Sequence, residues 1–303
     1  MRLGYACINE TLKAKKIRAN RNCKKATFQS KGLAHVRDLI DQNLDGLLQI
    51  LQWNYANNIF VYRMSSDMIP WGSEFNFEDL PNWPELQAKF AAVGQYALDH
   101  NIRLSFHPGQ FCVLASPTES SVLNAVRELN VNGEVMDLLL QPRNHLAKIN
   151  IHLGGTYGGP KQPVYDRFIA NFNLLDESVK TRLTLENDDR ESLYSVEDLY
   201  HGICKHINIP IVFDYHHWQC HPGSLSQRDA LKLALSTWGD IRPCCHYSET
   251  AQIDDPTKMF KAHSRLIHSV IDDYGFDFDC VIEAKGKELA LLHYRNNVLK
   301  SAA

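Results

Sequence analysis

Histidines and acids that follow short apolar segments are the residues of this sequence best suited to chemistry. Six segments with the composition of buried β-strands end on residue types that bind metal ions. These positions are His107, His152, Glu186, Asp214 with His216 and His217, His246, and Glu283. Imidazoles and carboxylates together bind first-row divalent ions such as zinc, manganese and iron. One shared metal centre explains this set better than packing does.

Two of these acids stand where an unpaired carboxylate is costly. Glu186 and Glu283 follow runs of leucine, valine and isoleucine, where burying a lone charge costs several kcal/mol. Glu186 lies in the middle of the set and is placed to bridge two ions. Two or three ions a few ångströms apart suit phosphodiester hydrolysis, because one activates water while the others neutralise charge on the reacting oxygens. We therefore expect a cluster of two to three divalent ions.

Eight strands that alternate with eight helices would bring these distant residues together. Three expected strands are 3–8, 59–64 and 102–107, and the other five lie within 147–155, 182–188, 209–217, 242–249 and 280–285. The expected helices are 32–51, 83–100, 119–140, 165–179, 195–206, 227–238, 256–274 and 287–299.

This alternation predicts a parallel sheet of the α/β class, and eight units predict a closed (β/α)8 barrel, the TIM barrel. An open doubly wound sheet is the alternative, but no glycine-rich phosphate loop follows the first strand. Residues 1–303 would form a single TIM-barrel domain, since no linker or low-complexity segment divides them. The carboxyl ends of all eight strands then meet at one face, where barrel active sites lie.

The composition is that of a globular protein, with 44% hydrophobic and 22% charged residues in 303. No apolar run approaches the ~20 residues of a membrane helix, and the N-terminus lacks the apolar core of a signal peptide. We expect a cytoplasmic protein, nucleoid-associated in a bacterium, with its eight cysteines reduced. The net charge of -3 argues against a nucleic-acid coat protein but leaves room for a local basic face.

Residues 11–31 provide such a face, with eight lysines and arginines and no acid. The segment follows the first strand, so we expect it near the metal face and predict phosphate contacts from Lys15, Lys16, Lys24 and Lys25. A solvated loop is the alternative. Four polar and aromatic residues near the ligands are either core and capping residues or contacts to a displaced base: Tyr5, Asn9, Gln110 and Phe111.

The segments around these residues resemble the UV damage endonuclease family over nearly the whole chain. They are LGYACINETL (3–12), YRMSSDMIP (62–70), LSFHPGQ (104–110), NIHLGG (150–155), LEND (185–188), FDYHH (213–217), HYSE (246–249) and EAKGKE (283–288). The resemblance implies a TIM barrel related to endonuclease IV, with a three-metal site usually described with manganese. It also implies ATP-independent incision immediately 5′ to cyclobutane pyrimidine dimers and 6-4 photoproducts, with abasic sites as further substrates.

The resemblance also assigns roles to residues of this chain. The implied metal ligands are His107, His152, Glu186, Asp214, His217, His246 and Glu283, with His263 as a further ligand. Gln110 and Phe111 match the pair that probes the damaged bases, while Tyr5 and Asn9 match residues that contact the lesion. The expected cofactor is manganese, with zinc or magnesium as alternatives, and no nucleotide. The expected partner is damaged double-stranded DNA, bound by a monomer.

Three positions depart from the family pattern. Glu74 replaces a histidine, and Cys244 replaces a lysine that is found carboxylated as a metal ligand. The probing aromatic, usually tyrosine, is Phe111. Cys244 could bind metal as a thiolate and favour zinc, and Glu74 changes the charge near the scissile phosphate. We expect Glu74, Glu186 and Glu283 to be catalytic.

Two other functions remain open from the sequence. A sugar isomerase or epimerase also sets two divalent ions at the mouth of a TIM barrel, although it needs neither a basic segment nor the Gln110–Phe111 pair. A DNA-damage binder whose catalysis is lost through Glu74 and Cys244 is the third hypothesis, and the retained ligands argue against it.

Overall fold

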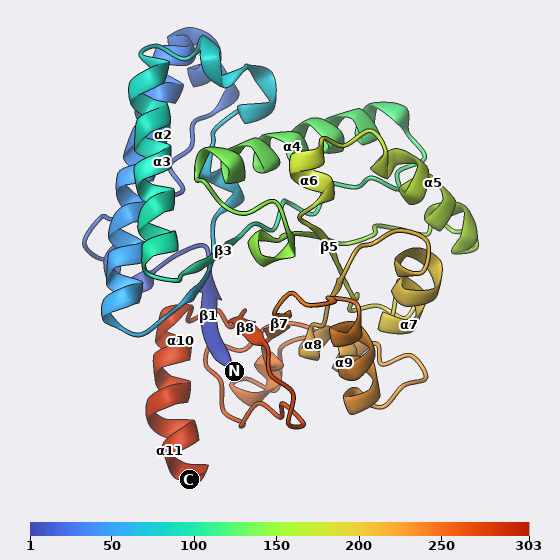
Figure 1. Cartoon of the computed structure of the whole chain (residues 1–303). Coiled ribbons are helices and arrows are strands. Elements are labelled where there is room, and N and C mark those ends of the chain that lie inside the picture. The colour runs from blue at the N-terminus through green and yellow to red at the C-terminus, as the bar shows by residue number, and fades with distance from the viewer. Residues whose placement is uncertain (303) are drawn as a thin grey trace.

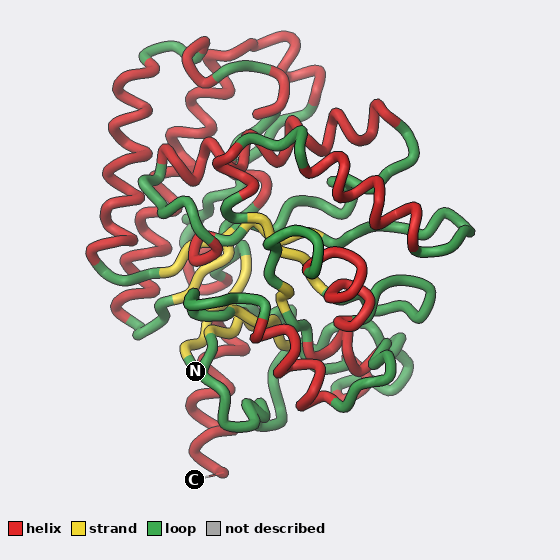
Figure 2. Tube along the Cα trace, turned by 45° about the vertical axis from the view of Figure 1, so that its right-hand side comes forward, coloured by secondary structure: helices red, strands yellow, loops and turns green. Residues whose placement is uncertain are grey.

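The computed structural model describes residues 1–302, in which parallel strands form a ring with the helices outside it (Figures 1 and 2). The strands are β1 (Arg2–Ala6), β2 (Val61–Arg63), β3 (Arg103–Ser105), β4 (Ile149–Ile151), β5 (Leu183–Glu186), β6 (Ile211–Val212), β7 (Cys244–Tyr247) and β8 (Asp279–Ile282). One sheet has the order β3-β2-β1-β8-β7 and the other β4-β5-β6. Parallel bridges from Phe106 to Ile149 and from Asp214 to His246 join the two sheets. The predicted (β/α)8 barrel is confirmed.

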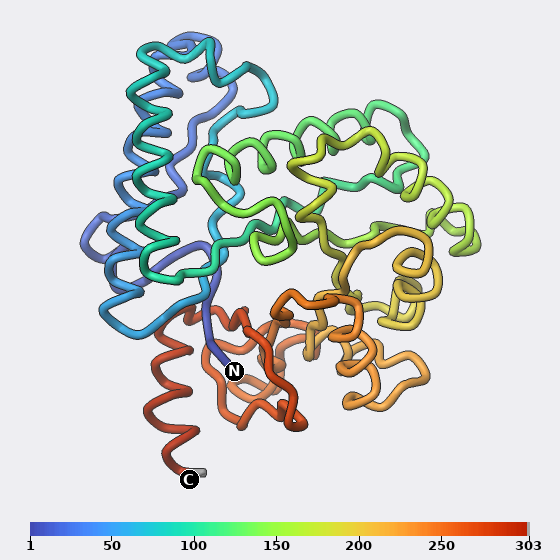
Figure 3. The backbone as a smooth tube through the Cα atoms, viewed as in Figure 1, coloured from blue at the N-terminus to red at the C-terminus, as the bar shows by residue number. Residues whose placement is uncertain are grey.

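Helices follow most strands and cover the ring. They are α1 (Glu10–Lys13), α2 (Lys25–Ala56), α3 (Trp83–Asp99), α4 (Glu119–Leu138), α5 (Gln162–Phe172), α6 (Glu177–Lys180), α7 (Val196–Leu199), α8 (Tyr215–Cys220), α9 (Gln227–Ser236), α10 (Glu288–His293) and α11 (Leu299–Ala302). A π-helical turn continues α7, and a second one joins α10 to α11. The long helices α2 and α3 pack side by side, and the trace ends in α11 (Figure 3). Within residues 1–302, no helix combines the length and the apolar character needed to cross a membrane.

The helix after β1 begins earlier than the sequence predicts. Its expected start was Gly32, but α2 begins at Lys25 and bends at Gly32, whose φ of +65° suits glycine alone at little cost. The core face of α2 has the expected spacing, with Val36, Ile40 and Leu44 fully buried. Lys25 therefore opens a helix instead of standing in a loop.

The predicted helix 256–274 is wrong, because this part of the chain is a long loop with only turns. The carboxylate of Glu249 accepts hydrogen bonds at 2.8 Å from the backbone N–H groups of both His268 and Ser269. These donors are thus satisfied by a side chain and need no helix. The two buried isoleucines Ile267 and Ile271, four residues apart, have the spacing that is typical of a helix.

A buried ion-pair network closes the base of the barrel, at the amino ends of the strands. Asp279 accepts from Arg2 at 2.7 Å, from Arg103 at 3.1 Å and from Arg242 at 2.6 Å. The guanidinium of Arg103 also lies 5.4 Å from the ring centre of Trp238. These contacts satisfy a carboxylate that has no exposed surface.

Candidate metal centre

Strands β4 and β5 carry the interior of the site on alternate residues. Successive side chains of a strand point to opposite faces, so every second residue faces the inside of the barrel. These inward positions are polar: Lys148, Asn150 and His152 along β4, and Thr184, Glu186 and Asp188 along β5. Thr184 donates to the amide oxygen of Asn150 at 2.8 Å, and the Asn150 amide donates to Glu186. This ladder leads to the metal-ligand types at the mouth.

Two groups of ligand atoms converge at the mouth of the barrel. In each group, the atoms that could bind a metal lie within 4.8 Å of one another. The first group is His107, His152 and Glu186, and the second is Glu186, Asp214, His246 and Glu283. Glu186 belongs to both groups, which is the arrangement that a bridging carboxylate requires.

The residues of the second group fit a divalent ion. Nδ1 of His246 lies 3.1 Å from a carboxylate oxygen of Glu186 and 3.0 Å from one of Glu283. This nitrogen and Oδ2 of Asp214 are buried, and neither has a hydrogen-bond partner among residues 1–302. Buried polar atoms are rarely left unsatisfied, and a cation between these atoms would satisfy them together.

Polar contacts on the far side of three imidazoles, those of His107, His217 and His152, favour one tautomer. Nδ1 of His107 lies 3.0 Å from the carbonyl oxygen of the next residue, and Nδ1 of His217 lies 2.9 Å from the carbonyl oxygen of Asn187. Nδ1 of His152 lies 3.0 Å from the Asp188 carboxylate. A proton held on Nδ1 leaves the lone pair of Nε2 free for a metal. Asp188 and Asn187 therefore orient the predicted ligands His152 and His217, respectively.

His217 and His263 lie beside the two groups but belong to neither. Nδ1 of His217 is 3.3 Å from Glu186, and its ring centre is 6.4 Å from that of His263. The ring of His216, which is fully buried, lies 5.4 Å from that of His263. The structure therefore places His217 next to the shared carboxylate and His263 near both His217 and His216, and the binding of a further ion by His217 and His263 stays a prediction.

Carboxylates at the mouth of the barrel favour the protonated form of neighbouring histidines in the absence of a metal ion. Burial disfavours the imidazolium of His152, but Glu186 and Asp188 outweigh it and raise its pKa to about 9. Burial also opposes protonation of His217, yet Asp214 and Glu186 raise its pKa to about 10. Burial would raise the pKa of Glu186, but His246 and His152 hold it well below its usual value. A metal ion must displace protons from these histidines.

Several residues of the site were not predicted individually. Arg63, at the end of β2, forms an ion pair with Glu283. Nζ of the buried Lys148 lies 2.9 Å from Nε2 of His246, and burial lowers the pKa of this lysine to about 8. The alternation of polar and apolar residues in KINIH (148–152) was the available signal for Lys148 and Asn150. Arg63 ends an apolar run, as the predicted ligands do.

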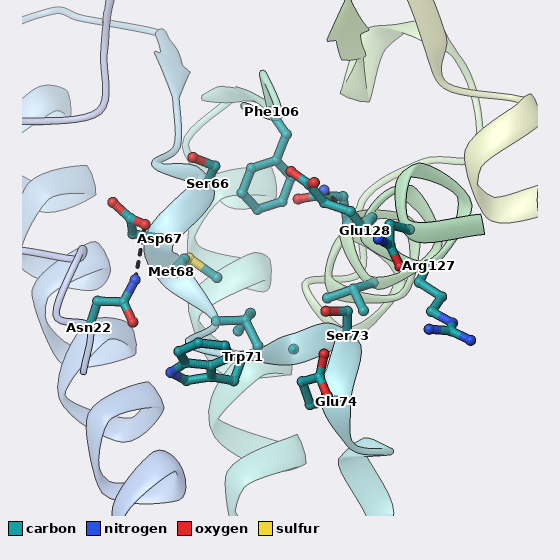
Figure 4. A pocket seen from close by; sticks show the side chains of 15 residues that line it. Asn22, Ser66, Asp67, Met68, Trp71, Ser73, Glu74, Phe106, Arg127 and Glu128 are labelled. Atoms are coloured by element: carbon teal, nitrogen blue, oxygen red, sulfur yellow. Dashed lines mark hydrogen bonds between the residues drawn. The ribbon is translucent and has the colours of Figure 1, made fainter. Parts of the chain in front are cut away.

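Glu74 lies on the wall of a cavity and in neither group of converging ligands in residues 1–302. The cavity has a volume of about 380 Å³ and lies between the loop after β2 and helix α4 (Figure 4). Its lining includes Phe106, which precedes His107, and the acids Asp67 and Glu128. Burial raises the pKa of Glu128. The lining therefore mixes charged with apolar side chains, and Phe106 links it in sequence to His107.

Tyr5 lies in the core and Asn9 caps helix α1. This is the structural role that the sequence left open for these residues as the alternative to contacts with DNA. Both are buried, and the Tyr5 hydroxyl donates to Asn54 at 2.8 Å and accepts from Asn9 at 2.9 Å. The Asn9 side chain also accepts from the backbone N–H of Leu12 at the start of α1. Contact with a lesion would require these hydrogen bonds to open, and it stays a prediction.

The other predicted DNA contacts are on the surface. Gln110 and Phe111 stand in the loop between β3 and α4, and Phe111 is 86% exposed. The four lysines of the basic segment are also exposed: Lys15, Lys16, Lys24 and Lys25. Cys244, in contrast, is buried two residues before His246 and is absent from the converging groups found in residues 1–302. Its role as a ligand stays a prediction.

Comparisons with known proteins agree over the whole chain. Residues 1–301 match the family model described as UV-endonuclease UvdE. The chain is 38% identical, over 96% of its length, to a protein of Schizosaccharomyces pombe named UV-damage endonuclease. The alignment covers 49% of that protein, so the chain spans about half the length of this curated relative.

Two solved structures give the same architecture. The crystal structure of SacUVDE is 30% identical, with a TM-score of 0.82 and 96% of each chain covered. Endonuclease IV from Thermus thermophilus is 12% identical, with a TM-score of 0.59 and 97% of this chain and 98% of that chain covered. At that identity, the second likeness concerns the fold alone.

Proposed function

The chain belongs to the UV-endonuclease family, and on this premise we propose that it is a metal-dependent DNA repair endonuclease. It nicks double-stranded DNA immediately 5′ to cyclobutane pyrimidine dimers and 6-4 photoproducts, with abasic sites as a further class of substrate. The observation that carries the proposal is Glu186, whose carboxylate is shared by two converging groups of ligands at the mouth of the barrel. Such a site suits the hydrolysis of a phosphodiester.

Bound divalent ions, with manganese first and zinc or magnesium as alternatives, would activate water and neutralise charge on the reacting oxygens. His107 and His152 would hold one ion with Glu186, and the second group would hold another. Arg63 neutralises part of the charge of Glu283 and fixes its carboxylate. Glu186 and Glu283 thereby act as ligands in catalysis, and Glu74 acts at the scissile phosphate from the wall of the cavity.

Recognition of the lesion is assigned to the surface beside His107. Gln110 and Phe111 are exposed and can enter a stack that damage has already weakened. The cavity beside Phe106 accepts displaced bases, because its carboxylates and the guanidinium of Arg127 can bind the polar edge of a base. The four exposed lysines of residues 15–25 bind phosphates of the flanking duplex.

The decisive experiment is nicking of plasmid DNA by the purified protein. Irradiated and intact plasmids are incubated with manganese and, separately, with a chelator. Nicks that require both irradiation and metal support the proposal. Retention of irradiated plasmid without nicks would support a damage binder, and no interaction with either plasmid would leave a sugar epimerase or isomerase as the better hypothesis.

The basic segment has a separate test. Replacement of Lys15, Lys16, Lys24 and Lys25 by alanine should lower the slope of log affinity against log salt by up to about 3.6, or 0.9 per phosphate contact. A double variant of Lys232 in α9 and Lys300 in α11, which are also exposed, serves as the control. An unchanged slope in the fourfold variant would exclude the segment from the DNA interface.

A further inference from the structure

An exposed apolar pair flanked by lysines stands on the loop after β7. Met259 is 67% exposed and Phe260 is 45% exposed. The side chains of Lys258 and Lys261 on either side are 56% and 40% exposed. Two adjacent large apolar side chains in water are unfavourable, and such groups commonly mark a contact surface.

Hydrogen bonds hold this part of the loop in a closed turn. The backbone N–H of Ala251 donates to the carbonyl of Ala262 at 2.6 Å, and the N–H of Ala262 donates to the carbonyl of Met259 at 2.9 Å. The side chain of Gln252 donates to the carbonyl of Lys258 at 2.9 Å. A bridge between Thr250 and His263 closes the base of the turn. The apolar pair is therefore presented by ordered backbone, which lowers the entropy lost on binding.

The turn lies at the rim of the metal centre. The ring centre of Phe260 is 5.9 Å from that of the buried His216. Nζ of Lys261 is 3.8 Å from the carboxylate of Asp189, three residues beyond Glu186. A substrate that reaches the shared carboxylate therefore passes close to this turn.

The turn stands across the mouth from Phe111. In the ring of strands, β3 and β7 are four positions apart in either direction, so the loops that follow them lie on opposite sides of the mouth. One loop carries Phe111 and the other carries Met259 and Phe260. Both loops expose apolar side chains, and the metal ligands lie between them.

We propose that Met259 and Phe260 form a second wedge against duplex DNA, on the side of the scissile phosphate opposite Phe111. Methionine and phenylalanine are side chains that proteins insert at base steps from the minor groove, which kinks the duplex. Lys258 and Lys261 bind the flanking phosphates. Their present contacts, at 3.6 Å to Asp255 and 3.8 Å to Asp189, are exposed and weak, so phosphates can replace them. The wedge rests on the proposed function, since it requires DNA at this mouth.

The test is binding of a duplex with one defined photoproduct, labelled at both ends for energy transfer, in the presence of a chelator so that no strand is cut. The double variant Met259→Ala/Phe260→Ala should bind this duplex about tenfold more weakly than the unaltered protein and should bend it less. Its affinity for the undamaged duplex should hardly change. A double variant of Leu98 and Leu289, apolar residues 41% and 40% exposed on α3 and α10, is the matched control and should behave as the unaltered protein does.

The lysines have their own readout, because replacing Lys258 and Lys261 by alanine should lower the salt slope by about 1.8. Equal affinity and equal bending by the Met259/Phe260 variant, with its melting temperature unchanged, would overturn the wedge. That result leaves the proposed function intact if the unaltered protein still nicks irradiated plasmid. A failure of the unaltered protein to nick or to prefer the damaged duplex would refute the proposed function and the wedge with it.

Discussion

The two ends of the barrel both bury charge, but they pair it in opposite ways. The same strands serve both ends: β3 starts with Arg103 at the base and leads to His107 at the mouth, while β8 starts with Asp279 and leads to Glu283. At the base, one carboxylate meets three guanidinium groups. At the mouth, several carboxylates meet imidazoles.

The two ends differ in whether their positively charged side chains can become neutral. Arginine stays protonated at every accessible pH, so the base needs its counter-ion permanently and serves the stability of the fold. Histidine can become neutral, so the mouth can exchange protons for metal ions. The mouth also keeps Oδ2 of Asp214 and Nδ1 of His246 without hydrogen bonds within residues 1–302, at a cost in stability that ion binding would recover.

The largest expected effect is a loss of activity when the mouth of the barrel is altered. Glu186→Gln should lower the nicking rate by about 10³-fold or more, because the loss of a shared ligand removes several kcal/mol of charge stabilisation. The barrel should remain folded near pH 8, since the histidines left without a counter-ion can release their protons. Nicking assays and circular dichroism measure both effects. Nearly full activity in this variant would contradict a bridging carboxylate.

The reverse pattern is expected at the base. Asp279→Ala should destabilise the protein by about 3–5 kcal/mol, because three arginines lose their buried partner. Burial alone would raise the pKa of Asp279, but Arg2 and Arg103 hold it below its usual value. The carboxylate therefore contributes stability above the unfolded pKa of about 3.9, and this contribution is lost as the pH falls through the folded pKa.

Urea unfolding of the unaltered protein and of Asp279→Ala tests this sign. The difference in unfolding free energy should be largest near neutral pH and should shrink as the pH falls below about 4. A difference of less than about 1 kcal/mol near neutral pH would mean that the network contributes little.

Metal ions should stabilise the mouth in a pH-dependent way. Manganese at a hundred times its dissociation constant should add about 2.7 kcal/mol to the unfolding free energy, seen as a higher melting temperature. The pKa of His152, about 9, means that its imidazolium stabilises the metal-free fold below the unfolded pKa of about 6.5 and stops doing so as the pH rises through 9. At one fixed manganese concentration, the shift in melting temperature should therefore grow from pH 6.5 to pH 9. A shift that falls over this range would refute proton displacement.

The smallest expected effect concerns a residue that only positions a ligand. Asp188→Asn should weaken manganese binding about 10–100-fold, because the carboxylate that holds Nδ1 of His152 becomes a neutral amide. The pKa of His152 should also fall, which NMR titration of the metal-free protein can follow. Gln87→Glu, a charge change of the opposite sign at an exposed position of α3, is the control. Unchanged metal affinity and an unchanged His152 pKa would remove Asp188 from the site.

The positions of the ligands could be predicted because two sequence patterns agree. Ligand residue types stand at the ends of apolar strands, and strands alternate regularly with helices. An inward-facing acid at the end of an apolar strand, as in LTLE (183–186), has few structural explanations, and a closed ring brings such residues together. The long loop 256–274 was missed because a single side chain, Glu249, replaces helical hydrogen bonds across the fold. Tyr5 and Asn9 show the same limit, since their partner Asn54 is distant in sequence.

The seams between the two sheets have a consequence for how the protein moves. Only isolated bridges join β3 to β4 and β6 to β7 within residues 1–302, so the barrel is least firmly closed at these two places. His107, His246 and Glu283 come from the larger sheet, whereas His152, Glu186 and Asp214 come from the smaller one. Each ion of the proposed pair would therefore have ligands from both sheets and link one sheet to the other. Amide hydrogen exchange along the smaller sheet should then slow when the ions bind, so that the cofactor of the reaction also locks the scaffold that carries it.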